Sequence, residues 1–573
     1  MINRIRLLSV LLCTAVAASL MAQNSDDAGP VTQTYFIKDA FVVQKPGTVL
    51  PKTSLVIKDG LITNMGASIS APYDAKIIDA DSMYVYAAWI DAAGHTGISK
   101  AEEGDRPKVK NPGNPPNDVA GVTPQLLAAD LIDYGDKSIK EMRSAGYGYA
   151  HVLPRGRMLP GSGALITTGE GGRDAMLLNP GTGMYSQLTS ARGVFPNTVI
   201  GVMSKYRDLY KNAQHVAKYE AQYQKNPAGL TRPNASKELA ALAPVVNKQA
   251  PVFFRAEKVR DILKVLTLQK ELGFDLVLTD TRQVHKVLPK VSSSTPLVLS
   301  LELPKEIKSK DDKDKKGEDK DDKKEGKEEA KKEKEVVETD PLKEAFDKRK
   351  MAAYEDYESQ AAAVAKAGRK FAFSTISTKP KDASANIKRM IKRGLTADQA
   401  LAALTTNAAA LTGLSNVAGT VEKGKLGNIL ICDKPYFEEK SKIKMMIVDG
   451  KVYEYEEKKK KSSGASSEDI SGTWSYTLEI PGQETAGTMV IEKDGDSYAV
   501  KLDSSDEPGD YEDAFDVVMD GSTLSFGMTV DNSGMTLNIT SEMTFDGDEF
   551  SGTMSIAEFG SFPVTGSKTS QPK

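Results

Sequence analysis

The spacing of apolar and polar residues divides the chain into three stretches with different predicted secondary structure. Residues 35–82 hold β-branched and aromatic residues in short runs separated by Pro-Gly and Asp-Gly turns, which predicts β-strands. From about 86 to 415, short apolar runs alternate with amphipathic helical stretches, which predicts parallel βα units. Residues 470–570 show strand-length segments at a spacing of roughly 8–12 residues, which predicts an acidic antiparallel barrel or sandwich domain.

The middle stretch has the length of one α/β barrel. Its runs APVFFRA, FDLVLTD and TPLVLSLELP predict buried strands, and KVRDILKVLTLQKELG predicts an amphipathic helix between two of them. A (β/α)8 barrel has about 250 residues, and insertions add to that length. We therefore expect a TIM-like (β/α)8 barrel over 86–415.

A charged segment interrupts this barrel. Residues 305–339 hold 13 Lys and 14 Asp or Glu and almost no apolar residue. Such a segment cannot bury enough surface to offset its ordering entropy, so we expect a disordered insertion in a loop. A partner-binding tail is the alternative, although its opposite charges nearly cancel.

The net charge of −3 hides a division of charge along the chain. After a Lys- and Ser-rich linker at 458–469, residues 466–573 hold 21 acidic residues against 4 Lys, a net of −17, which leaves +14 for residues 1–465. Either the two parts dock on each other or the acidic part serves solubility. The near-neutral sum argues against a general nucleic-acid partner, because phosphate neutralisation needs a basic surplus.

The first 22 residues have the pattern of a signal peptide. Arg4 and Arg6 precede an apolar core from Leu7 to Leu20, which is shorter than the roughly 20 apolar residues of a transmembrane span. We therefore expect export to the periplasm or cell surface of a bacterium and no transmembrane span. Cleavage would leave only Cys432, which makes neither an internal disulfide nor a thiolate metal cluster.

Two segments far apart in the chain resemble the amidohydrolase superfamily, in particular its imidazolonepropionase-like, secreted bacterial branch. They are SLVIKDGLITNMG with IIDADSMYVYAAWIDAAGHTG, and GLTADQALAALTTNAAALTGL with GTVEKGKLGNILICD and KMMIVDGKVYEYE. The resemblance implies a metal-dependent hydrolase of C–N bonds on a TIM-like barrel. It also implies a composite β-sandwich, with 31–85 as its N-terminal part and 416–457 as its C-terminal part.

The metal-binding pattern of that family is degenerate here. The D-x-H-x-H motif falls on Asp91 to His95, and Ala93 takes the place of its first histidine. The resemblance places the fifth-strand histidine near Arg255, whose permanent positive charge would repel a divalent ion. It places the sixth-strand histidine near Thr279 or Asp280. The candidate site residues are therefore Asp91, His95, Arg255 and Asp280.

The eighth-strand aspartate of the family falls on Ile376, which offers no oxygen. Only three further histidines exist in the chain, and of these His151 follows a predicted strand and is a weak candidate ligand. His215 and His285 lie in predicted helices. Arg155 and Arg157 are weak candidates for binding an anionic ligand, with surface ion pairs as the alternative.

Three functional hypotheses follow from these residues. The first is an amidohydrolase-like protein without the usual hydrolysis, which binds a small molecule or peptide or acts as partner of a homologous amidohydrolase subunit, with no cofactor. The second is an active hydrolase of C–N bonds whose altered site holds one metal ion, such as Zn²⁺, or none. The third is binding of an apolar ligand by the C-terminal β domain.

Overall fold

The computed structural model describes most of the chain. It covers residues 33–100, 108–305, 341–455 and 469–570, the last range with short gaps at 481–482, 495–496, 505–506, 521, 533–534 and 557–559. The expected signal peptide lies outside the described residues. So do the charged insertion apart from Lys305 and the linker apart from Asp469.

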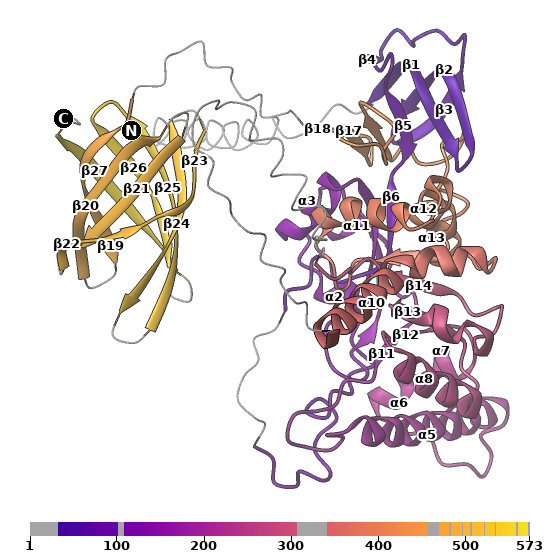
Figure 1. Cartoon of the computed structure of the whole chain (residues 1–573). Coiled ribbons are helices and arrows are strands. Elements are labelled where there is room, and N and C mark those ends of the chain that lie inside the picture. Colours follow the sequence, from indigo (N-terminus) through magenta and orange to yellow (C-terminus); the bar gives the residue numbers. More distant parts are fainter. Residues whose placement is uncertain are drawn as a thin grey trace, which may run out of the picture. The chain divides into compact units, whose positions relative to one another are not determined.

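The chain divides into two compact units at residue 455. Unit 1 contains a mixed β-sheet and a barrel with its helices, and unit 2 is an antiparallel sheet (Figure 1). Each unit has its own buried apolar cluster, and the large cluster of unit 1 fills the barrel and packs its helices.

Strands from both flanks of unit 1 form one sheet next to the barrel, in the order β18-β17-β16-β5-β1-β2-β3, with β4 paired to β1. The flanks join where β16 pairs antiparallel with β5, with Leu430 opposite Tyr86. Alternate side chains such as Ile37, Ile57 and Ile431 are buried on the apolar face, as the period of a half-buried strand requires. The strands are β1 (Thr34–Lys45), β2 (Thr48–Lys58), β3 (Leu61–Gly66), β4 (Lys76–Asp79), β5 (Tyr84–Ala87), β16 (Ile429–Cys432), β17 (Ile443–Val448) and β18 (Lys451–Glu454).

The barrel strands follow each other in chain order around the core. Parallel pairing joins β6 to β7 and continues from β11 through β12, β13 and β14 to β15. The Thr375 N–H, just after β15, donates to Ala93 O in β6 at 2.9 Å and links the last strand to the first. The strands are β6 (Trp89–Gly94), β7 (Tyr147–Val152), β8 (Gly161–Ser162), β9 (Ala164–Thr167), β10 (Leu177–Asn179), β11 (Met184–Gln187), β12 (Val252–Arg255), β13 (Leu276–Thr281), β14 (Leu297–Ser300) and β15 (Ala372–Ser374).

Two short strands between β7 and β11, β8 and β9, run against the direction of the other barrel strands. β9 pairs antiparallel with β7, and β8, one residue before it, pairs antiparallel with β11. Gly163 lies between β8 and β9, where an added Cβ would lie 2.7 Å from Thr182 Oγ1 and 2.9 Å from His151 Nε2. The regular βα alternation expected from the sequence is therefore interrupted at the third barrel position.

The helices of unit 1 lie around these strands (Figure 1). α8 illustrates how the sequence forms such a helix. Its residues Ile262, Val265 and Leu268 share the buried face, and Gly273 ends the helix in the left-handed conformation, with φ +76°. The helices are α2 (Ala128–Leu131), α3 (Lys137–Ser144), α4 (Arg173–Met176), α5 (Val199–Lys225), α6 (Lys237–Ala241), α7 (Ala243–Val246), α8 (Val259–Leu272), the 3₁₀ helix η1 (Val284–Lys290), α10 (Pro341–Lys366), α11 (Pro380–Lys392), α12 (Ala397–Leu404) and α13 (Thr406–Thr412).

Unit 2 is a single antiparallel sheet that curls into a barrel-like form, in agreement with the antiparallel pattern of the sequence. β19 pairs with both β20 and β27, and residues 507–520 pair through β22 with β21 and through β23 with β24. The Trp474 ring packs edge-on against Phe545 and Phe550 in its core. The strands are β19 (Gly472–Ile480), β20 (Gln483–Asp494), β21 (Ser497–Ser504), β22 (Glu507–Asp513), β23 (Phe515–Asp520), β24 (Thr523–Asn532), β25 (Met535–Asp546), β26 (Glu549–Ile556) and β27 (Gly560–Ser570).

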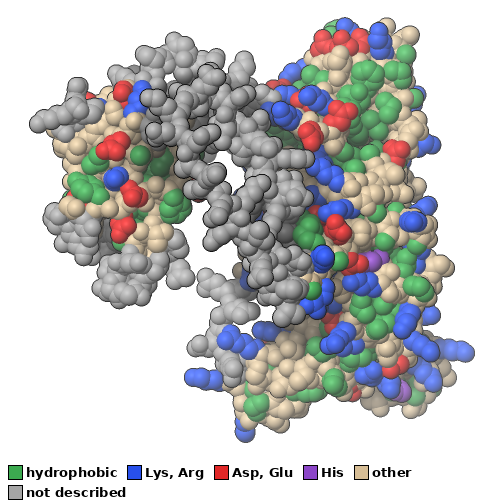
Figure 2. Space-filling model, in the orientation of Figure 1, with side chains coloured by type: hydrophobic (Ala, Val, Ile, Leu, Met, Phe, Trp, Pro, Cys, Tyr) green, Lys and Arg blue, Asp and Glu red, His purple; other side chains and the backbone are tan. Residues whose placement is uncertain are grey.

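Lys and Arg side chains are spread over the visible face of unit 1 (Figure 2), which is the part of the chain with the positive net charge. Within the described residues, none of the helices combines the length and the apolar character needed to cross a membrane.

Candidate functional site

The carboxyl ends of the parallel barrel strands form the barrel mouth, and β6 brings Asp91 there. Asp91 is fully buried, and its Oδ1 accepts the N–H groups of Ala93 at 3.3 Å and Thr375 at 3.2 Å. Its Oδ2 accepts the Thr375 hydroxyl at 2.6 Å. Burial raises the pKa of Asp91 to about 7 although these hydrogen bonds lower it. Asp91 therefore connects β6 with the end of β15.

Gly94 leaves the space for this contact. A Cβ at Gly94 would lie 2.1 Å from Asp91 Oδ2 and 2.8 Å from the Thr375 hydroxyl oxygen, so no larger residue fits without moving them. The fourth position of the degenerate D-x-H-x-H motif is thus fixed by packing between β6 and β15.

His95 follows β6 and lies in the mouth with one ring nitrogen in use. Its Nδ1–H donates to Leu153 O at 2.7 Å, which leaves Nε2 as an acceptor. Burial lowers the pKa of His95 to about 4, and Arg155 and Arg255 act in the same direction, so the ring is neutral at pH 7. Its edge faces the Tyr185 ring at a centroid distance of 6.0 Å.

Charged side chains fill the mouth across β12, β13 and the end of β14, and together we call them the charged ladder: Asp280, Arg255, Glu257, Arg282 and Glu302. Arg255 Nε donates to Asp280 Oδ2 at 3.0 Å, and Arg255 Nη2 lies 2.7 Å from Glu257 Oε1. Arg282 continues the ladder to Glu257 at 3.3 Å and to Glu302. Every neighbour in the ladder therefore has the opposite charge.

Asp280 is the buried end of the charged ladder, and its backbone is strained. Its φ is +53°, a left-handed conformation that is uncommon for residues other than glycine, at a register irregularity between β13 and β14. Ser377 donates to Asp280 Oδ2 at 2.9 Å and accepts from Arg255 Nη2 at 2.8 Å. Asp280 Oδ1 is buried without a hydrogen-bond partner. Strained residues of this kind gather at functional sites.

Tyr185 lies on β11, the strand that pairs with β12. It is fully buried, its hydroxyl has no hydrogen-bond partner, and burial raises its pKa well above the usual range. Arg255 and Asp280 lie within electrostatic range of it, as do Glu257 and Arg155. Tyr185 is thus the point at which the charged ladder, His95 and Arg155 approach each other.

His151 does not reach this group. Its Nδ1–H donates to Ala92 O at 2.8 Å, and its Nε2 accepts from the Thr182 hydroxyl at 2.6 Å. Burial lowers its pKa to about 4, and the ring packs edge-on against Phe253. Both ring nitrogens are occupied, so His151 has no free lone pair for a metal ion.

The remaining candidates separate in the structure. Arg155 is exposed, donates through Nε to Ile98 O at 2.7 Å, and forms no ion pair within the described part of the chain. Arg157 donates to Ser190 O instead. His215 is exposed on α5, and His285 contacts Asp356 at 2.9 Å outside the mouth.

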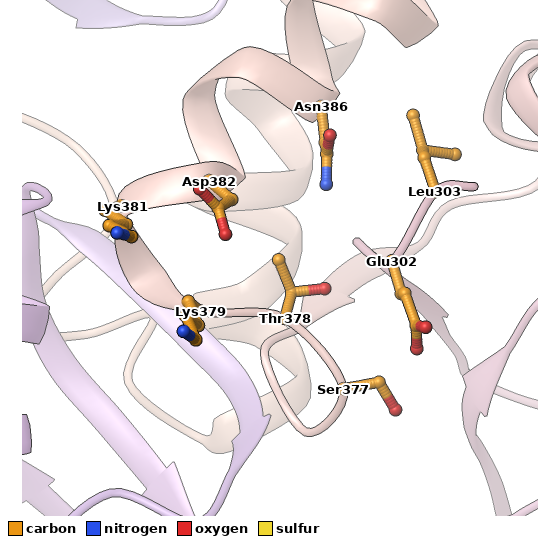
Figure 3. A pocket seen from close by; sticks show the side chains of 8 residues that line it. All are labelled: Glu302, Leu303, Ser377, Thr378, Lys379, Lys381, Asp382 and Asn386. Carbon is orange, nitrogen blue, oxygen red and sulfur yellow. The ribbon is translucent and has the colours of Figure 1, made fainter. Parts of the chain in front are cut away.

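Two cavities adjoin the charged ladder. The first has a volume of about 410 Å³ and lies at the start of α11, where Ser377 and Glu302 belong to its lining (Figure 3). The second has a volume of about 220 Å³, and Arg255 and Glu257 belong to its lining. Open space therefore borders the ladder at Glu302 and Ser377 and again at Arg255 and Glu257.

These side chains do not fit the divalent metal of the implied family. Ala93 has no lone pair, the guanidinium of Arg255 occupies Asp280, and Ile376 offers no oxygen. In the residues that the structure describes, no three or more His, Cys, Asp and Glu side chains are grouped to hold a metal ion. His95 Nε2 is the one imidazole acceptor that these described residues bring to the mouth.

Reasoning from sequence missed Tyr185, Glu257, Arg282 and Ser377. A signal for two of them was present, because VFFRAE and LVLTDTR each place two charged residues two positions apart at a strand end. Side chains at i and i+2 share one face of a strand, so opposite charges on neighbouring strands predict ion pairs. Nothing in the sequence distinguishes Tyr185 from the other tyrosines.

Comparison with one solved structure supports the barrel fold, and a family model matches part of the chain. Residues 318–453 match the model of the amidohydrolase family. A crystal structure of an amidohydrolase from Thermotoga maritima has a TM-score of 0.58 at 18% identity, over 74% of this chain and 100% of that chain. A β-aspartyl dipeptidase from Fervidobacterium islandicum has a TM-score of 0.39 at 14% identity, over 74% of this chain and 97% of that chain. Curated proteins gave no match.

Proposed function

We propose, from the premise that the chain belongs to the amidohydrolase superfamily, that it binds a small molecule or acts as a partner subunit without metal-dependent hydrolysis. One observation carries the proposal: the charged ladder occupies the mouth in which the family holds its metal ligands. Arg255 and Asp280 neutralise each other there at 3.0 Å.

The chemistry of the ladder argues against a metal centre. A guanidinium stays protonated in proteins, so Arg255 is a fixed positive charge that a divalent ion would have to approach. Asp280, the nearest carboxylate, already accepts Arg255 and Ser377 on Oδ2. Freeing it would leave Arg255 partly buried without this partner, which is costly in a low-dielectric interior.

Metal analysis of the purified protein tests the proposal. The protein is incubated with Zn²⁺ or Mn²⁺ and desalted, and its metal content is measured by elemental mass spectrometry. We expect far less than one metal ion per chain. Near-stoichiometric zinc that disappears in His95→Ala together with a hydrolytic activity would refute the proposal.

A substrate screen gives a second, independent test. Amides, lactams and dipeptides are assayed with and without added metal, and we expect no turnover above that of the buffer. Turnover that survives in His95→Ala would point instead to a contaminating enzyme. Metal-stimulated turnover that co-purifies with the intact chain would support the alternative of an active hydrolase.

Localisation and partners remain part of the proposal. The basic start and apolar core of residues 1–22 support export to the periplasm or cell surface. A homologous, catalytically competent amidohydrolase subunit is the proposed protein partner. Binding of an apolar ligand by unit 2 stays a prediction.

A further inference from the structure

A third cavity lies at the end of the barrel where the strands begin, away from the mouth. Its volume is about 270 Å³, and its lining includes neither His95 nor any residue of the charged ladder. Thr182, Pro251 and Pro296 belong to the lining and come just before β11, β12 and β14, whose carboxyl ends lie at the mouth. This cavity is therefore separate from the site described above.

The cavity has a buried floor and an exposed rim. His151, Phe253 and Val277 are at most 5% exposed and form the floor, where the His151 ring meets the Phe253 ring edge-on at a centroid distance of 4.5 Å. Asn179 and Ala410 are exposed and form part of the rim. A ligand can therefore enter from the surface and lie against buried side chains.

The lining is uncharged. Among the described residues that line the cavity, none is Asp, Glu, Lys or Arg, and burial lowers the pKa of His151 to about 4, so its ring is neutral at pH 7. A charged ligand would lose hydration here without meeting an opposite charge, which is costly. The cavity therefore favours neutral molecules.

Two side chains give the cavity a hydrogen-bonding end, Asn179 at the end of β10 and Thr182 three residues later. The Thr182 hydroxyl donates to His151 Nε2 at 2.6 Å, which fixes its direction and leaves its oxygen free to accept. Asn179 Oδ1 accepts the Gly181 N–H at 3.0 Å, and its Nδ2 group has no partner in the described part of the chain. These two side chains thus offer one acceptor and one donor.

We infer that this cavity binds a small neutral molecule that has an apolar ring and one hydroxyl group. The ring lies against Phe253, Val277 and Leu411, and the hydroxyl donates to Thr182 and accepts from Asn179. An apolar cavity of about 150 Å³ holds one benzene molecule, so 270 Å³ has room for a ring with a short side chain. The inference goes beyond the proposed function, because it uses neither the barrel mouth nor a protein partner.

Benzyl alcohol is the probe, and its binding to the full chain is measured by ligand-observed NMR titration. Benzylamine and benzoate have a similar shape but carry a charge at pH 7, and toluene has the ring without the hydroxyl. We expect saturable binding of benzyl alcohol. Benzylamine and benzoate should bind at least about tenfold more weakly, because the uncharged lining does not compensate their desolvation.

Two variants locate the bound probe. Ala410→Trp places a large side chain at the rim and should weaken benzyl alcohol and toluene at least about tenfold. Thr182→Val keeps the shape of the side chain without the hydroxyl, so it should weaken benzyl alcohol roughly threefold to tenfold and leave toluene unchanged. Ala221→Trp is the control, because Ala221 is exposed on α5 and does not line the cavity.

Four results would overturn the inference. They are an absence of saturable benzyl alcohol binding, equally tight binding of benzylamine or benzoate, full affinity in folded Ala410→Trp, and a loss in Thr182→Val that is as large for toluene as for benzyl alcohol. None of these results depends on metal content or hydrolysis, so a failure of this inference and a failure of the proposed function are distinguishable.

Discussion

Asp91 is a buried carboxyl whose protonation is coupled to folding. Its pKa rises from 3.8 to about 7 because burial outweighs three hydrogen bonds. The folded chain therefore takes up a proton at Asp91 between these values. The resulting stabilisation is fully present below about pH 4 and is lost as the pH rises through about 7. The lowered pKa values of His95 and His151 act with the opposite sign, since they destabilise the fold as the pH falls from 6.5 to about 4.

Asp91→Asn separates these effects. The free energy of unfolding of the variant, relative to the wild type, should rise by up to about 4 kcal/mol between about pH 4 and pH 8, since three pKa units correspond to that energy. Urea titrations followed by circular dichroism measure the difference at each pH. The exposed Asp118→Asn should follow the wild type throughout. A constant difference between Asp91→Asn and wild type would contradict the assignment of the proton to Asp91.

Arg255 should matter for stability through the charge that it neutralises. Arg255→Met removes a partner of the fully buried Asp280, and breaking such a pair costs roughly 3–5 kcal/mol. Arg255→Met with Asp280→Asn removes both charges, and Asn tolerates the left-handed conformation of this position. The double variant should therefore recover much of the lost free energy in urea unfolding. Arg173→Met, at an exposed pair, should change little.

At the scale of elements, the third barrel position depends on Gly163. Gly163→Ala would press a methyl group against Thr182 and His151, and overpacking of this kind costs typically about 1–3 kcal/mol. Thermal unfolding measures the loss. Gly181→Ala is a matched control in the loop between β10 and β11, because an added Cβ there meets no atom within 4 Å. Equal stability of the two variants would show that the antiparallel segment adapts without strain.

The elements also show how far the sequence could be interpreted. The apolar pattern located β12 and β13, because they are short buried apolar runs, and α8, because it buries one face and ends at a glycine. It did not reveal the reversed direction of β8 and β9, since a fully buried strand has the same composition in either direction. Burial patterns describe each strand alone, whereas direction is decided by the neighbours with which it pairs.

The same limit applies to the mouth. The identities of Ala93 and Arg255 predicted the loss of metal ligands, because side-chain chemistry is readable residue by residue. Asp91 and Thr375 are 284 positions apart in the chain, so their contact could not be predicted from the sequence pattern around either residue. The unpartnered hydroxyl of Tyr185 is a property of its surroundings and so has no signature in the chain.

At the scale of the whole molecule, two units with separate cores should unfold separately. The chain has two tryptophans, and each core holds one of them, Trp89 in unit 1 and Trp474 in unit 2, both fully buried. Trp474→Phe therefore leaves a fluorescence signal from unit 1 alone, and Trp89→Phe leaves one from unit 2 alone. The two variants turn one chain into two independent reporters of unfolding.

A cavity placed in one core tests the independence of the units. Met543→Ala removes a fully buried side chain from unit 2, which costs about 2–5 kcal/mol in a packed core. The urea midpoint of the Trp474 signal should fall, and the midpoint of the Trp89 signal should stay where it was, because additivity holds for sites without shared partners. Met142→Ala in the core of unit 1 should do the reverse. If both signals shift together in either variant, the units are energetically coupled, and the opposite net charges of +12 on residues 1–455 and −15 on residues 456–573 become the first candidates for the coupling.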